Sequence, residues 1–254
     1  MGKLLTIPSE LSTDYDLVDS TLISKEREFL TEIGDEKEPL DFFPQVKIKR
    51  WNNEANFSLR LQNVGNHRSG TVSANQGKVT WSGGGLKMLF ERKPTIYGTP
   101  GLDWSIEIPS RPLANQLRFS IITRGLSFHY QPHVVQYLPH ETDPQPRPEH
   151  IKGSYAVYHA QMKTGGVRAL DCPRDVFNNL NDPFWNTPRG QEMIAAGRGG
   201  SYKTGKAFNI YRPKAVDALG AEIWADIDIN EVSGFLTIDI DNQWLNDATY
   251  PVMV

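Results

Sequence analysis

Cysteine is almost absent from this chain of 254 residues, which contains Cys172 and no second thiol to pair with it. An intramolecular disulfide is therefore excluded, and the fold must depend on an apolar core, which a chain of this length can bury. An excess of charge of one sign is also absent, because 27 basic and 30 acidic residues give a net charge of -3. Proteins that coat nucleic acid present a strongly positive surface, so we expect no direct binding of nucleic acid.

Long apolar runs are missing as well. No stretch approaches the roughly 18 consecutive apolar residues of a membrane-spanning helix. The first residues, MGKLLTIPSELS, lack the apolar centre and the cleavage site of a secretory signal. We therefore expect no membrane partner.

Short runs in which apolar and polar residues alternate dominate the chain from residue 46 onward. They are VKIKRW, NFSLRLQ, KVTWSG, LKMLFER, LDWSIEIP, LRFSIITRGLSFHY and AFNIYRP. A period of two is typical of strands with one buried face. Because no helical segment alternates with these runs, residues 46–254 are predicted to form an all-β domain, a two-sheet antiparallel sandwich of jelly-roll-like type.

Three segments fall outside the predicted strands. Residues 1–45 are polar and acid-rich, and we expect an N-terminal arm that holds either a short helix within residues 19–34 or no fixed structure of its own. A proline-rich loop covers residues 131–150, and a loop insertion covers about 163–204. The apolar residues of the arm and the insertion are candidate subunit contacts: Phe29, Leu30, Phe177, Phe184 and Trp185.

Four aspartates alternate with isoleucines in WADIDINEVSGFLTIDIDNQWL, residues 224–245. We expect residues 222–230 and 235–241 to form a hairpin with Gly234 in its turn. Pairing Asp226 with Thr237 would place the isoleucines on the core side and the aspartates on the outer side.

Three uses of these carboxylates remain open. Asp226, Asp228 and Glu231 approach the E-x-D-x-x-E spacing of a family of jelly-roll glycoside hydrolases, although aspartate replaces the first glutamate and Glu231 falls in the turn. Asp226, Asp228, Asp239 and Asp241 could hold a surface cation, but glutamate stands where an EF-hand loop needs glycine. The simplest interpretation is a solvated strand face with no metal and no catalytic residue.

Four segments carry a resemblance to a known family: LRFSIITRGLSFHYQP, RPEHIKGSYAVYHA, YKTGKAFNIYRPKAVDALG and LTIDIDNQWLNDATYPV. They resemble a poorly characterised family of β-sandwich proteins encoded by tailed bacteriophages. The last segment also resembles a β-domain of large bacterial surface proteins that closes on an ATYPV strand. The resemblance covers roughly residues 46–160 and 201–252.

The resemblance implies a virion-associated structural protein, which is a capsid decoration or minor head protein, or a tail or fibre attachment module. We therefore expect a non-enzymatic protein without cofactors, made in the host cytoplasm and located in the virion. Its partners would be other virion proteins, in a homo-oligomer or on a lattice where repeated contacts add affinity. The alternative is a carbohydrate-binding or glycoside-cleaving β-sandwich that uses Asp226, Asp228 and Glu231, with a glycan as partner.

Overall fold

The computed structural model describes residues 9–12, 14–25, 29–63, 65–75, 78–93, 101–132, 134–135, 145–146, 148–160, 183–188, 190–191 and 205–254. The chain divides into two compact units, Met1–Arg124 with Pro213–Val254 (unit 1) and Gly125–Arg212 (unit 2). The predicted domain of residues 46–254 therefore includes parts of unit 1 and the whole of unit 2. The run LRFSIITRGLSFHY is broken at Gly125, whose φ of 67° ends one strand and starts the next.

Unit 1 contains an eight-stranded sheet in which every pair of neighbours is antiparallel. In spatial order its strands are β1 (Tyr15–Val18), β2 (Thr21–Ser24), β3 (Phe29–Ile33), β4 (Gln45–Arg50), β5 (Ala55–Leu61), β10 (Gln116–Arg124), β19 (Phe235–Asp239) and β18 (Asp226–Asn230). The edge strands of this sheet are therefore β1 and β18.

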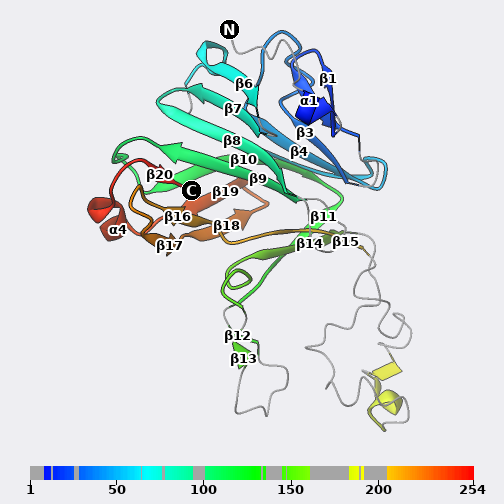
Figure 1. Cartoon of the computed structure of the whole chain (residues 1–254). Coiled ribbons are helices and arrows are strands. Elements are labelled where there is room, and N and C mark those ends of the chain that lie inside the picture. The colour runs from blue at the N-terminus through cyan, green and yellow to red at the C-terminus, as the bar shows by residue number, and fades with distance from the viewer. Residues whose placement is uncertain are drawn as a thin grey trace. The chain divides into compact units, whose positions relative to one another are not determined.

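A second, seven-stranded antiparallel sheet completes unit 1 (Figure 1). Its strands, in spatial order, are β17 (Glu222–Trp224), β16 (Lys214–Val216), β20 (Val252–Met253), β9 (Gly101–Ile108), β8 (Leu86–Lys93), β7 (Lys78–Gly83) and β6 (Thr71–Asn75). The two large sheets pack together, so the predicted all-β sandwich is confirmed.

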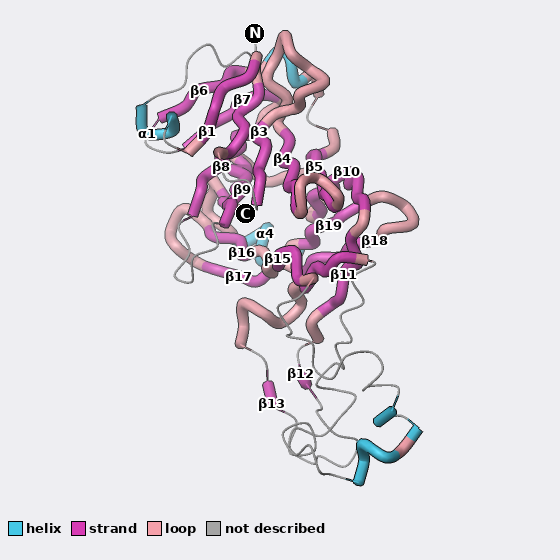
Figure 2. Tube along the Cα trace, turned by 90° about the vertical axis from the view of Figure 1, so that its right-hand side faces the viewer, coloured by secondary structure: helices cyan, strands magenta, loops and turns pink. Residues whose placement is uncertain are grey.

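Helices are short throughout the described ranges (Figure 2). Unit 1 has α1 (Ser9–Ser12), the 3-10 turn η1 (His67–Ser69) and α4 (Asn242–Asp247). Within those ranges, no helix has the length and apolar character needed to cross a bilayer.

The core of unit 1 lies between the two sheets. Phe57, Phe119 and Leu236 of the eight-stranded sheet are buried, as are Trp81 and Phe90 of the seven-stranded sheet. These are the inward positions that the alternating runs predict.

An aromatic contact joins the two layers. The ring of Trp104 on β9 packs edge-on against Phe119 on β10, with centroids 5.3 Å apart, and its other neighbour is Phe90 at 5.1 Å. Aromatic pairs of this kind stabilise a core beyond the area that they bury. The contact places β9 directly across the core from the centre of the eight-stranded sheet.

The predicted N-terminal arm is wrong for the residues that the structure describes. β1, β2 and β3, at Tyr15–Val18, Thr21–Ser24 and Phe29–Ile33, extend the eight-stranded sheet beyond β4. The apolar stripe expected on a helix is instead spread over strands, with Leu22, Phe29 and Ile33 all buried. Short strands with few residues each carry a weak local signal, and pairing with β4 is what stabilises them.

A buried ion cluster ties β3 to β4. Glu32 is 1% exposed and lies directly opposite Lys47, with its carboxylate 3.6 Å from the Lys47 ammonium and in contact with Lys49. Glu36 adds a second carboxylate at 3.0 Å from Lys47. A buried carboxylate needs such partners to remain charged, so this part of the chain belongs to the folded domain.

Unit 2 is built around a three-stranded antiparallel sheet of β11 (Leu126–Tyr130), β14 (Tyr155–His159) and β15 (Lys206–Ile210). A two-stranded ladder, β12 (Val134–Val135) with β13 (Gln145–Pro146), and the 3-10 turn η2 (Pro183–Asn186) also belong to it. Most of the predicted proline-rich loop and most of the loop insertion at 163–204 lie outside the described residues.

Candidate functional site

The aspartate hairpin occupies one edge of the eight-stranded sheet. β18 pairs with β19 through a turn at residues 231–234, in which Gly234 has φ 72° and donates a hydrogen bond to the Asn230 carbonyl at 3.0 Å. The predicted turn glycine is confirmed. The predicted register is wrong by two positions, since Asp226 lies opposite Asp239 and not Thr237, because the turn takes up four residues.

The first strand of the predicted hairpin is also interrupted. Residues 222–224 form β17 in the seven-stranded sheet, whereas β18 begins at Asp226 in the eight-stranded sheet. Between them Ala225 is 1% exposed, and its N–H donates to the Pro213 carbonyl at 3.0 Å. The chain therefore changes sheets at a small buried residue, which the alternating pattern alone does not reveal.

The two later aspartates have structural partners of their own. Asp239 accepts a hydrogen bond from the Gln116 side-chain amide at 2.9 Å. Asp241 caps α4 by accepting from the backbone N–H of Trp244 at 2.7 Å. In the part of the chain that the structure describes, no group of three or more His, Cys, Asp or Glu residues is arranged to hold a metal ion. The four-aspartate cation site is therefore not formed there.

The three acids of the glycosidase alternative do not share an enclosed site. Asp226 and Asp228 are exposed on the outer side of an edge strand, and Glu231 is exposed in the turn that follows. A carboxylic acid that protonates a leaving group depends on a partly desolvated environment. The exposure favours a solvated strand face, and the carbohydrate alternative stays a prediction.

The predicted subunit contacts separate into different environments. Phe29 is 7% exposed, so it belongs to the core of unit 1 and is not available to a partner, while Leu30 is half-buried on the opposite side of β3. In η2, Trp185 is 3% exposed and packs edge-on against the half-buried Phe184, with ring centroids 5.5 Å apart. Phe177 lies outside the described residues.

A surface that the sequence did not single out lies on β10, an inner strand of the eight-stranded sheet. Ile122 on β10 is 69% exposed; Ser58 on β5 lies opposite it, and the pairing of β10 with β19 ends two residues earlier, at Ser120. Its neighbours Phe119 and Ile121 are buried, so Ile122 points away from the core. An exposed branched aliphatic side chain on a central strand is unusual, because such positions are either polar or covered.

Arginines surround this isoleucine on the same side of the sheet. Arg124 is the next outward position after Ile122 on β10, and Arg118 precedes Ile122 on that face with Ser120 between them. The Arg118 guanidinium stacks 3.6 Å from the centroid of the Phe235 ring on β19. We call Arg118, Ile122, Arg124 and Phe235 the β10 surface. Aromatic, arginine and aliphatic side chains together are the composition of energetically important protein contacts.

One sequence signal for this surface was available. In QLRFSIITRG the residues Ile121 and Ile122 are adjacent, so strict alternation cannot bury both. One of the two isoleucines had to face outward, and the structure shows which.

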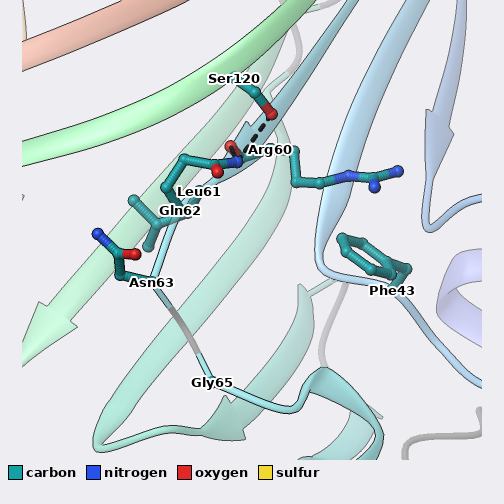
Figure 3. A pocket seen from close by; sticks show the side chains of 7 residues that line it. All are labelled: Phe43, Arg60, Leu61, Gln62, Asn63, Gly65 and Ser120. Carbon is teal, nitrogen blue, oxygen red and sulfur yellow. Dashed lines mark hydrogen bonds between the residues drawn. The ribbon is translucent and has the colours of Figure 1, made fainter.

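The eight-stranded sheet also borders an open depression of about 610 Å³ (Figure 3). Its lining residues are Phe43, Arg60, Leu61, Gln62, Asn63, Gly65 and Ser120. Mixed amide, hydroxyl and aromatic groups of this kind can bind sugars when an aromatic ring face is free to stack.

The polar and aromatic groups of this depression are largely engaged with one another. The Phe43 ring contacts the Arg60 guanidinium at 3.9 Å and the His67 ring at 4.0 Å. The Gln62 amide donates to the Ser120 hydroxyl at 2.8 Å, which Figure 3 shows as a dashed line. Burial lowers the pKa of His67 below its ordinary value of 6.5, so this ring is neutral at pH 7. The depression therefore presents no free aromatic platform at Phe43.

Arg60 is likewise held in place. Its guanidinium donates to the Asp35 carboxylate at 2.5 Å and to the Gln45 side-chain carbonyl at 3.0 Å. These bonds connect β5 to β4 and to the turn that follows β3. The arginine therefore has a structural role here, and we assign no function to the depression.

No family model, no curated protein and no solved structure matches this chain.

Proposed function

We propose that this chain is a non-enzymatic virion structural protein of the tailed-bacteriophage type that its sequence resembles. In this proposal it is made in the host cytoplasm and built into the particle, where it binds neighbouring subunits through the β10 surface. The observation that supports the proposal is the exposure of Ile122 on an inner strand of a large sheet, on the same face of that strand as Arg118 and Arg124.

An isoleucine in water forgoes the roughly 1.5–3 kcal/mol that burial of its side chain would contribute. A neighbouring subunit that covers it recovers this free energy. Arg118 and Arg124 can meanwhile pair with carboxylates at the rim of the contact.

The proposal agrees with the arrangement of the carboxylates. Asp226, Asp228 and Glu231 are exposed, and none of them lines the depression beside Phe43. A subunit that occupies repeated positions on a particle needs only modest contacts, because many of them act together.

The first test is incorporation into particles by the Ile122→Asp variant. A charge at the centre of the β10 surface should reduce the amount of chain in purified virions by about tenfold or more, which corresponds to about 1.4 kcal/mol or more of lost contact free energy. Quantitative mass spectrometry of gradient-purified particles measures the copy number. Because Ile122 is exposed, the melting temperature of the isolated variant should match that of the unchanged chain.

Leu219→Asp is the matched control. Leu219 is 81% exposed in the turn between β16 and β17, so the same kind of substitution is made away from the β10 surface. Normal incorporation of both variants would contradict the role of this surface, and absence of the unchanged chain from virions would overturn the whole proposal.

A further inference from the structure

The last strand of the seven-stranded sheet has one unpaired edge. β6 pairs with β7 in an unbroken register from Thr71 opposite Ser82 to Asn75 opposite Lys78. Within the described residues β6 has no other strand partner and no backbone–backbone hydrogen bond outside that ladder. Alternate residues of such a strand direct their backbone N–H and C=O groups away from the sheet, where another strand can pair with them.

The composition of β6 differs from that of the other edges. Its sequence is TVSAN, with no charged residue, no proline and no bulge. The remaining edges of the two large sheets all carry an acidic side chain, which is Asp16 on β1, Glu222 on β17, and Asp226 with Asp228 on β18. Charged side chains on an edge discourage pairing between sheets, so β6 alone lacks this protection.

We propose that β6 pairs antiparallel with β6 of a second copy of this chain, about a twofold axis at Ser73. The two seven-stranded sheets would then continue into one another. This inference does not depend on the proposed virion role, because it concerns a different surface and a different sheet.

The sequence of β6 is self-complementary in this register. Ser73 would face Ser73 of the second copy, Thr71 would face Asn75, and Val72 would face Ala74. Thr71, Ser73 and Asn75 are exposed on the outer side, so small polar groups meet there, while Val72 and Ala74 extend the half-buried inner side. No like charges oppose each other.

The same operation fails on β18. A twofold axis at Asp228 would place two copies of that carboxylate directly opposite each other, at a Cβ separation of roughly 5 Å. Opposed carboxylates repel, so charge selects β6 over β18 for self-association.

The affinity of such a contact is expected to be modest. A single added strand pair buries a small area, and small interfaces are typical of weak or transient association. The dimer should therefore form at high protein concentration in solution.

The test is the mass of the full chain by sedimentation velocity over a wide concentration range. The unchanged chain should shift from monomer to dimer as its concentration rises. Ser73→Lys and Ser73→Glu should each remain monomeric at every concentration, because each places like charges at the twofold axis. An equimolar mixture of the two variants should form dimers again, since lysine then faces glutamate.

Thr80→Lys is the matched control. Thr80 is the cross-strand partner of Ser73 on β7, so it adds the same charge to the same side of the sheet, one strand away from the edge. This variant should dimerise as the unchanged chain does. Melting temperatures of all three variants establish that each one is folded.

Three outcomes would overturn the inference. One is an unchanged chain that is monomeric at all concentrations, which would leave the edge to a strand of a different protein. Another is a Ser73→Lys variant that still dimerises, and the third is a mixture of the two charged variants that stays monomeric. None of these results affects the prediction that Ile122 is needed for incorporation into virions. The proposed virion role and the proposed β6 dimer can therefore be refuted independently.

Discussion

Residues of one type serve different purposes within a single motif. Of the four aspartates in the C-terminal hairpin, Asp241 caps a helix, Asp239 accepts a hydrogen bond from Gln116, and Asp226 and Asp228 are exposed on an edge strand. Each role follows from the local backbone. A motif of alternating acids is therefore weak evidence for a shared site until the register and the neighbours are known.

Gly70 is a single residue whose small size the packing of the core requires. A Cβ at this position would lie 2.5 Å from Cε2 of the fully buried Trp81 indole. Gly70→Ala should therefore destabilise unit 1 by about 1–3 kcal/mol, because the indole cannot move without disturbing the core. Urea unfolding followed by tryptophan fluorescence measures the difference.

Gly101→Ala is the control for that prediction. A Cβ at Gly101 has Lys93 Cβ as its nearest neighbour, at an ordinary contact distance of 3.7 Å. This variant should stay within about 0.5 kcal/mol of the unchanged chain. Equal free energies of unfolding for the two variants would show that the close contact with Trp81 does not destabilise Gly70→Ala.

At the scale of elements, the edge strands decide how the sandwich meets other proteins. β18 ends the eight-stranded sheet and carries two exposed aspartates at alternate positions. Aspartate has a low preference for strands, so its presence here is better explained by protection of the edge than by strand formation. β6 has no such protection.

Neutralising β18 should therefore promote association. The double variant Asp226→Asn with Asp228→Asn should aggregate faster than the unchanged chain at the same concentration and pH, by about severalfold in the initial rate of light scattering. Asp239→Asn is the control, because it removes one charge from β19, which is not an edge strand. If the double variant and the control behaved alike, edge protection would not be the role of these aspartates.

At the scale of the whole molecule, long-range hydrogen bonds hold the C-terminal segment in place. Asp217, which follows β16, accepts from the backbone N–H of Thr249 at 2.9 Å and from those of Ala221 and Leu219 at 2.8 and 2.9 Å. Thr249 leads into β20, which lies between β16 and β9. One carboxylate therefore joins a turn to the last strand of the chain.

These bonds predict a pH dependence of stability. The N–H of Thr249, followed by those of Ala221 and Leu219, holds the pKa of Asp217 below its ordinary value of 3.8. A carboxyl group with a lowered pKa contributes stability above its unfolded pKa and loses that contribution as pH falls through the lower folded value. Asp217→Asn should therefore melt below the unchanged chain at pH 7, and the gap should narrow as the pH falls from 4 toward 2.

Thermal melts at pH 7 and at pH 2.5 measure this gap. Asp16→Asn serves as the control, because Asp16 is exposed on β1 and its partner Lys25 is a surface residue. A gap for Asp217→Asn that is the same at both pH values would show that its charge is not the source of the stability.

The sequence by itself determined the local structure of this protein. Alternation of apolar and polar residues located β5, β7, β8 and β9 almost to the residue and assigned the inward side chains, since the two faces of a strand follow from a period of two. Gly234 marked its turn for an equally local reason, the positive φ that the turn requires.

The choice of neighbouring strands, and of the faces that remain open, depends on contacts between distant parts of the chain. β5 pairs with β10 although four strands of the other sheet separate them in sequence, and residues 222–230 divide between two sheets at Ala225. The formation of β1, β2 and β3, the exposure of Ile122 and the edge position of β6 all depend on such pairings. Strand pairing joins residues far apart in the chain, and a local pattern carries no information about the partner that satisfies it.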